Sequence, residues 1–143
     1  MLTILHIADL HRSHEQPVSN AELISSLLAD CERYSAEQPA IPRPNAIVLS
    51  GDLVQGLPLN SPDYPHALKA QYDEALSFLV MLSEEFLQGD RSKLIIVPGN
   101  HDVDWNIAHQ ALSRVKLKGH DVYQLLSSPG SGNMGLTILI TLL

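Results

Sequence analysis

Cysteine is almost absent from the sequence, since Cys31 is the only one among 143 residues. A single cysteine excludes an internal disulfide and fits a reducing compartment. Aromatic residues make up only 5% of the chain, which disfavours a platform for stacking single-stranded bases. Basic residues are also scarce, nine Lys and Arg against sixteen Asp and Glu, so the net charge is -7. This acidity disfavours nucleic acid as a partner, because clustered Lys and Arg dominate phosphate binding.

Long hydrophobic runs are missing as well. No apolar stretch reaches the roughly 20 residues that a membrane-spanning helix needs. Residues 1–6 carry no basic region and no small-residue cleavage site, so they predict a first strand and not a signal peptide. We therefore expect a cytoplasmic protein with no membrane partner. The composition, 45% hydrophobic and 17% charged, is that of a globular domain, and the length fits a single one.

What the chain does have is an alternation of strand and helix patterns. Nearly continuous apolar runs at 2–8, 46–49 and 93–97 predict strands, the first of them central and covered on both faces. Two long segments with helical spacing, at 20–34 and 67–88, lie between these runs. The order predicts an α/β fold with a mainly parallel sheet and flanking helices, joined by right-handed crossovers.

The helices carry recognisable signals. Ser19 and Glu22 form a capping box in front of the first helix. Asp104 is expected to cap a third helix. The second helix should bury a stripe made of Leu68, Tyr72, Ala75, Leu76, Leu79, Leu82 and Phe86. The third should bury Trp105, Ala108, Ala111, Leu112 and Val115.

Two of the predicted strands are followed at once by aspartate. Asp9 and His11 come after the first strand, and they would face one point if strand geometry continued through His11. Asp52 follows Gly51 after the second strand. A carboxylate with an imidazole suits Zn, Mn or Fe, and a divalent ion relieves the repulsion between close carboxylates. The alternatives are that Asp9 and His11 are ordinary turn and loop residues, and that Asp52 forms an Asx turn.

The third strand ends in Pro98-Gly99 and then presents three polar side chains. The amide oxygen of Asn100 is a candidate metal ligand where another carboxylate would add too much negative charge. His101 is a candidate acid or oxyanion stabiliser, and Asp102 could orient the turn by hydrogen bonding. Asn100 alone could instead be a turn residue in the left-handed region.

These blocks together resemble the first three motifs of the calcineurin-like metallophosphoesterases. The motifs are D-x-H at 9–11, G-D-x-x-x-G at 51–56 and G-N-H-D at 99–102, and the resemblance covers about residues 2–105. It implies the N-terminal half of an α/β/β/α sandwich with two divalent ions, Mn, Fe or Zn, at the strand ends. It implies hydrolysis of a small phosphomonoester or phosphodiester through attack by a metal-bound hydroxide. Two ions about 3.5–4 Å apart can activate water and clamp the reacting oxygens.

The resemblance also implies a role for each candidate residue. Asp9 and His11 would bind the first ion, Asp52 would bridge both ions, and Asn100 would bind the second. His101 would protonate the leaving oxygen or stabilise the phosphoryl group. Some members of the family have aspartate where Gln55 stands, and this aspartate holds the catalytic histidine, so Gln55 is a departure.

A larger departure concerns the C-terminal part. The family has two later histidine blocks, the last of them G-H-x-H, whereas Gly119-His120-Asp121 is followed by Val122 and is read as a coincidence. We therefore expect one domain over 1–143 that is incomplete at the C-terminus, with a motif-bearing core at 1–118 and a tail at 119–143. Within the tail, 127–135 looks like a loop and 136–143 is either a strand or a sticky or artificial end.

An incomplete sandwich has two expected consequences. It would bind metal weakly and have little activity alone, and its sheet would expose an apolar face that favours self-association. The alternative function is a non-catalytic regulatory or interaction module that keeps the fold. A Rossmann-type nucleotide site is disfavoured, because no G-x-G-x-x-G follows the first strand.

Overall fold

The computed structural model describes residues 2–13, 15–117 and 120–125, and from residue 110 onward it describes the backbone alone. The chain divides into two compact units. The first comprises Met1–Leu57 with Ser61–Val103, and the second comprises Pro58–Asn60 with Asp104–Leu143. The single domain expected over 1–143 stays a prediction.

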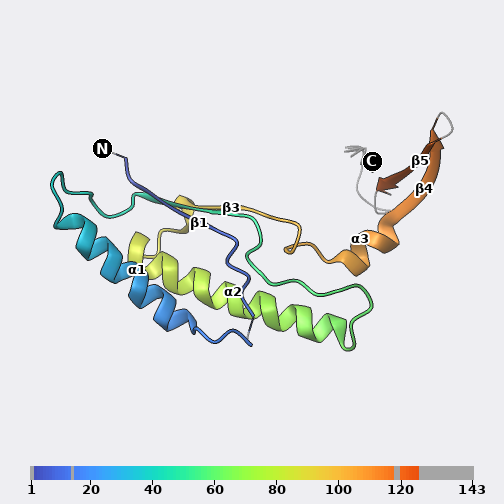
Figure 1. Cartoon of the computed structure of the whole chain (residues 1–143), viewed down its shortest axis with the longest axis horizontal. Helices are drawn as coiled ribbons and strands as arrows, with labels where there is room; N and C mark the ends of the chain where they lie inside the picture. Colours follow the sequence, from blue (N-terminus) through green and yellow to red (C-terminus); the bar gives the residue numbers. More distant parts are fainter. Residues whose placement is uncertain (1, 14, 118–119, 126–143) are drawn as a thin grey trace. The chain divides into compact units, whose positions relative to one another are not determined.

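A three-stranded parallel sheet is the centre of the first unit (Figure 1). Its strands are β1 (Ile4–Ala8), β2 (Ala46–Ser50) and β3 (Leu94–Val97), in the order β1-β2-β3. All three predicted strands are therefore present, and the α/β fold with a parallel sheet is confirmed. Because the strands are parallel and in register, their carboxyl ends lie along one edge, where the three motifs follow them.

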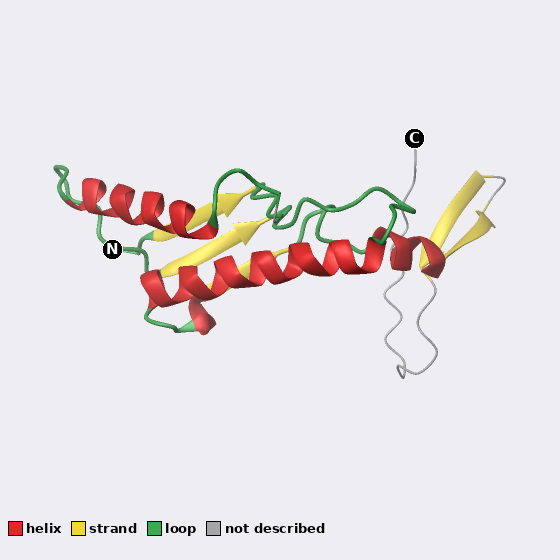
Figure 2. Ribbon diagram, turned by 90° about the horizontal axis from the view of Figure 1, so that it is seen from below, coloured by secondary structure: helices red, strands yellow, loops and turns green. Residues whose placement is uncertain are grey.

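Two long helices, α1 (Asn20–Ser35) and α2 (Tyr64–Leu87), cover one face of this sheet (Figure 2). Right-handed crossovers between neighbouring strands taken in sequence order place successive helices on the same side. The predicted capping box of α1 is confirmed, with Ser19 accepting from the backbone N–H of Glu22. A short 3-10 helix, η1 (Arg91–Lys93), leads into β3.

The core lies between the helices and the covered face of the sheet. Ile47 and Leu49 of the central strand pack with Phe78 and Leu82 of α2, and Phe78 and Leu82 are fully buried. The stripe expected on α2 is wrong in part, because Tyr72 is 37% and Leu76 is 58% exposed. The buried row runs at heptad-like spacing through Leu68, Gln71, Ala75, Phe78, Leu82 and Phe86.

The other face of the sheet is open to solvent in the described residues. Ile4, Ile95 and Val97 are each about half exposed on it, as expected for a sheet covered on one side. The prediction that the first strand is central and covered on both faces is wrong. β1 pairs only with β2, because apolar runs of this length do not distinguish a central strand from a half-covered edge strand.

The second unit contains α3 (Trp105–Ala111) and an antiparallel pair, β4 (Leu112–Leu117) and β5 (His120–Leu125). Asp104 caps α3 as predicted, accepting from the N–H of Ile107 at 3.0 Å. The expectation that the helix continues through Val115 is wrong. Residues from Leu112 onward pair with a later segment of the chain, and such non-local pairing overrides local helical spacing.

The predicted loop at 127–135 and the apolar segment 136–143 lie outside the described residues. Among the helices that the structure describes, none combines the length and apolarity required to cross a membrane.

Candidate metal centre

The three motif loops are joined by backbone hydrogen bonds at the carboxyl edge of the sheet. Asp9 N–H donates to Gly51 C=O at 3.2 Å, and His11 N–H donates to Asp52 C=O at 2.8 Å. Gly51 N–H in turn donates to Val97 C=O at 2.9 Å. The sheet ladder thus continues past the ends of the strands and brings the motifs together, although they are far apart in the sequence.

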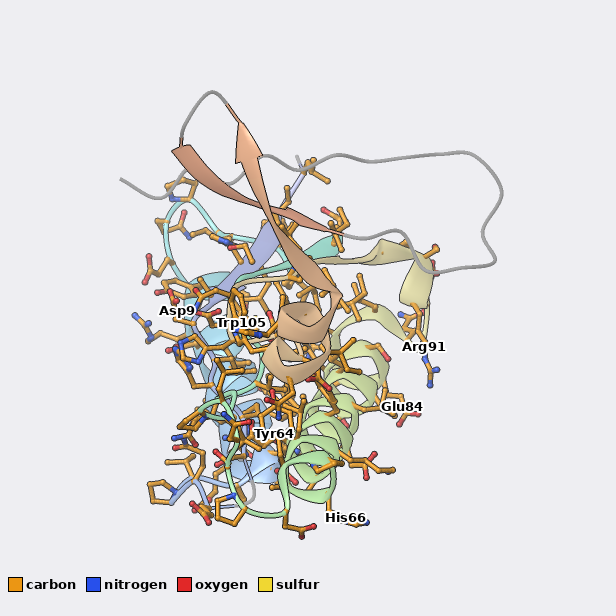
Figure 3. The ribbon with its side chains drawn as sticks, turned by 90° about the vertical axis from the view of Figure 1, so that its right-hand side faces the viewer. Asp9, Tyr64, His66, Glu84, Arg91 and Trp105 are labelled. Atoms are coloured by element: carbon orange, nitrogen blue, oxygen red, sulfur yellow. The ribbon has the colours of Figure 1, made fainter. Side chains whose placement is uncertain are left out.

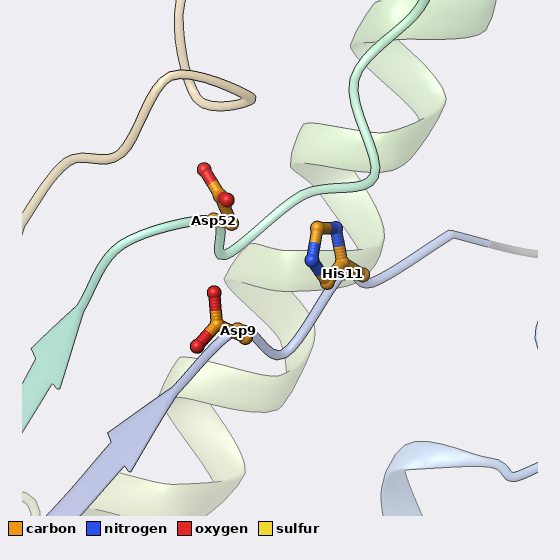
Figure 4. Close-up of side chains that lie close together, drawn as sticks. All are labelled: Asp9, His11 and Asp52. Carbon is orange, nitrogen blue, oxygen red and sulfur yellow. The ribbon is translucent and has the colours of Figure 1, made fainter.

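Asp9, His11 and Asp52 form one cluster at this edge (Figure 4). One potential ligand atom from each residue lies within 4.8 Å of those of the other two. Asp9 is exposed, whereas His11 and Asp52 are partly buried, so solvent and solutes reach the cluster. Two carboxylates and an imidazole are a donor set that suits Zn, Mn or Fe, and the residues present therefore fit a divalent cation.

The way in which Asp9 and His11 come together differs from the expectation. β1 ends at Ala8, and strand geometry does not continue through His11. Asp9, His11 and Asp52 each have a positive φ, of 53°, 49° and 50°. Left-handed backbone is uncommon for residues other than glycine and collects at functional sites. The sharp turns, and not the alternation of a strand, aim these side chains at one point.

Glycines make room for the cluster. A Cβ on Gly99 would overlap Asp52 Oδ1 and the backbone nitrogen of Asp52, so any side chain there would displace Asp52. Gly56 has φ +72°, and a Cβ on it would lie 3.0 Å from His101 Nδ1. Gly56 of the second motif and Gly99 of the third are thus required by close approach between loops.

His101 lies beside this cluster. Its ring packs edge to face against the ring of His11, with centroids 4.9 Å apart. The backbone N–H of His101 donates to Asp52 Oδ1 at 2.9 Å. Its Nδ1 is 2.5 Å from the backbone carbonyl of Gln55. A carbonyl only accepts, so Nδ1 carries the proton of this hydrogen bond, and Nε2 is the ring nitrogen left for chemistry.

Asp102 holds two motif loops together, which agrees with the orienting role considered for it. Its Oδ1 accepts from Val54 N–H at 2.9 Å, and its Oδ2 accepts from Gly99 N–H at 2.8 Å. Charge-assisted bonds to backbone donors are among the stronger ones in proteins. They tie the second motif loop to the third.

Asn100 stands between Gly99 and His101 and is exposed. Its position in the turn is compatible with a ligand role, which stays a prediction. Two other histidines of the first unit have partners of their own: His6 contacts Ser50 and His66 contacts Asp63. In the second unit, His109 is exposed on α3.

Sequence reasoning missed two features of the site. It considered only that the side chain of Gln55 departs from the aspartate of some family members, whereas the backbone carbonyl of Gln55 is the hydrogen-bond partner of His101. It also passed over Arg12, which follows the D-x-H motif and is 3% exposed. An arginine next to a candidate ligand is a weak signal, because most arginines are on the surface.

The fold and site define a class: an α/β protein with a carboxylate–histidine cluster that could hold a cation where parallel strands end. The model of the calcineurin-like phosphoesterase family (Metallophos) matches residues 2–139. The chain therefore belongs to this family of metal-dependent phosphoesterases, whose members typically bind two metal ions. No curated protein shows a significant match to the chain.

Proposed function

We propose that the chain is a metal-dependent phosphoesterase that hydrolyses a small phosphomonoester or phosphodiester. The observation that carries this proposal is the convergence of Asp9, His11 and Asp52 within 4.8 Å, with His101 against them, in a member of the family. We further propose that the resident cofactor is a pair of divalent ions, Mn, Fe or Zn. When bound, such ions activate water and neutralise charge on a phosphoryl group.

The side chains have distinct proposed roles. Asp9 and His11 would hold one ion, Asp52 would serve both ions, and Asn100 would supply an oxygen to the second. The left-handed turns at Asp9, His11 and Asp52 support this assignment, because they hold two carboxylates close together against their mutual repulsion.

His101 is the proposed catalytic residue. The hydrogen bond from its Nδ1 to the Gln55 carbonyl fixes the ring and directs Nε2 to be the acting nitrogen. In its protonated form the ring can donate from Nε2 to the leaving oxygen or to a phosphoryl oxygen. The backbone N–H of His101 also donates to one oxygen of Asp52, at 2.9 Å, so the residue that supplies the acid also holds the proposed shared carboxylate.

The test is metal content and hydrolysis measured on the same sample. The chain is loaded with Mn²⁺, its bound metal is quantified, and its turnover of a bis-aryl phosphate and of an aryl monophosphate is followed. Manganese-dependent turnover that is lost in His101→Asn and in Asp52→Asn supports the proposal. Because four donors are few for two ions, we expect weak binding and slow turnover. A folded chain that binds no Mn²⁺ would instead support a non-catalytic interaction module.

A further inference from the structure

One turn of α2 contacts all three motif loops. Gln71 Nε2 donates to Gly56 C=O at 3.3 Å, which is in the second motif. Tyr72 donates its hydroxyl to Asp102 C=O at 3.1 Å, in the third motif. Glu74 accepts from Arg12 at 3.2 Å, and Arg12 directly follows the first motif.

The contact with the first motif is partly buried. The Arg12 side chain is 4% exposed and that of Glu74 is 30% exposed. The two terminal nitrogens of Arg12 also donate to Val18 C=O at 3.1 Å. The guanidinium is thus fixed between the loop that carries Asp9 and His11 and the surface of α2.

The backbone of Arg12 joins the first loop to the second. Its N–H donates to Leu53 C=O at 2.8 Å, and its C=O accepts from Gln55 N–H at 3.2 Å. Gln55 is the residue whose carbonyl orients His101. A displacement of Arg12 would therefore move His11, its neighbour in the chain, and would move His101 through its hydrogen bond to Gln55.

Helix α2 is well suited to fix the positions of these loops. Gln71 and Glu74 are three residues apart, so they lie on adjacent rungs of one helical face. The helix is anchored in the core a turn further on, where Phe78 and Leu82 are fully buried. The loops contain the left-handed residues of the cluster.

We propose that Gln71, Tyr72 and Glu74 are positioning residues that set the spacing of the three motif loops and hence the geometry of the cation site. This proposal rests on the proposed function, because it concerns the same site. None of the three residues belongs to the cluster of Asp9, His11 and Asp52. They act through Gly56, Asp102 and Arg12, respectively.

The test compares Mn²⁺ affinity, measured by titration calorimetry, in variants of this turn. Tyr72→Phe removes only a hydroxyl, and Glu74→Ala removes the partner of Arg12. We expect each to weaken Mn²⁺ binding about tenfold or more, the range for groups that orient metal ligands. Glu74→Gln keeps an oxygen for Arg12 and should recover part of the loss.

Two controls separate positioning from charge and from helix stability. Asp73→Ala removes a carboxylate from the same turn, but Asp73 is exposed and pairs with Lys69. Glu84→Gln alters an exposed residue that projects outward from α2 (Figure 3). Both should bind Mn²⁺ within about twofold of the parent chain, since neither contacts a motif loop.

Thermal unfolding followed by circular dichroism shows which variants fold. Glu74→Ala leaves a buried guanidinium without its carboxylate, so Tyr72→Phe carries the test if Glu74→Ala does not fold. Folded Tyr72→Phe that binds Mn²⁺ as tightly as Asp73→Ala would overturn the positioning role and leave the proposed function standing. A parent chain that binds no Mn²⁺ while folded would instead overturn the proposed function.

Discussion

His101 directs its Nδ1–H to the backbone carbonyl of Gln55 at a distance of 2.5 Å. The contact uses the main chain, so the side chain at position 55 can change without altering it. In family members with aspartate at this position a side-chain carboxylate does the orienting. In this chain the backbone carbonyl of Gln55 orients His101 instead, and this hydrogen bond does not depend on a charge.

The first prediction follows from this contact. Gln55→Ala should leave the turnover of the manganese-loaded chain within about twofold, whereas His101→Asn should lower it by about 100-fold or more, the usual contribution of a general acid. Steady-state hydrolysis of an aryl phosphate measures both. A large loss in Gln55→Ala with an unchanged fold would show that the side chain and not the carbonyl orients the histidine.

The second prediction concerns two glycines with similar backbone angles. Gly56 and Gly89 have φ of +72° and +79°, but a Cβ on Gly56 meets His101, whereas one on Gly89 has nothing within 4 Å. Alanine at either position should cost roughly 1 kcal/mol in the free energy of unfolding, because left-handed backbone disfavours a Cβ. Only Gly56→Ala should also lower turnover, since only there is the histidine displaced. Urea unfolding and hydrolysis assays on the pair distinguish strain from displacement, and equal turnover in the two would contradict the role given to Gly56.

The third prediction is a trade between stability and metal binding at Asp9. Asp9→Asn keeps a residue that tolerates left-handed backbone and removes one of two close carboxylate charges. We expect the melting temperature of the metal-free protein to rise by about 1–3 °C, while Mn²⁺ affinity falls by more than about tenfold. Calorimetry with and without Mn²⁺ measures both effects. Asp73→Asn, on the exposed side of α2, is the control for net charge. A lower melting temperature of metal-free Asp9→Asn than of the metal-free parent chain would argue against repulsion in the cluster.

The fourth prediction is a pH dependence at the start of α1. Hydrogen bonds from the Ser19 hydroxyl and backbone N–H lower the pKa of Glu22 from its usual 4.5. A carboxyl with a lower pKa in the folded state stabilises the fold above the unfolded value and loses that contribution as the pH falls through the folded value. Glu22→Gln should therefore be less stable than the parent at pH 7, and the difference should disappear in strong acid. Denaturant unfolding between pH 7 and pH 2 measures this, with Glu85→Gln as the charge control. A difference independent of pH would exclude the ionised carboxylate as its cause.

The local features of the protein could be predicted from the sequence. The apolar runs before Asp9, Asp52 and Pro98 defined three strands, the capping box defined the start of α1, and the motifs at the strand ends defined the candidate ligands. These features depend on contacts between near neighbours or on the parallel alignment of strand ends. The helix expected beyond Ala111 failed for the opposite reason, because a strand partner further along the chain decides that segment.

Only the tertiary structure decided how the site is held. The left-handed turns at Asp9, His11 and Asp52 depend on backbone hydrogen bonds between loops. The residue type at position 55 does not predict that the backbone carbonyl of this residue orients His101. Tyr72 was expected in the buried stripe of α2, whereas its hydroxyl reaches Asp102. Glu74, which was not part of that stripe, reaches Arg12. Such contacts join positions 30 to 62 residues apart, and a period or a motif describes only neighbours along the chain.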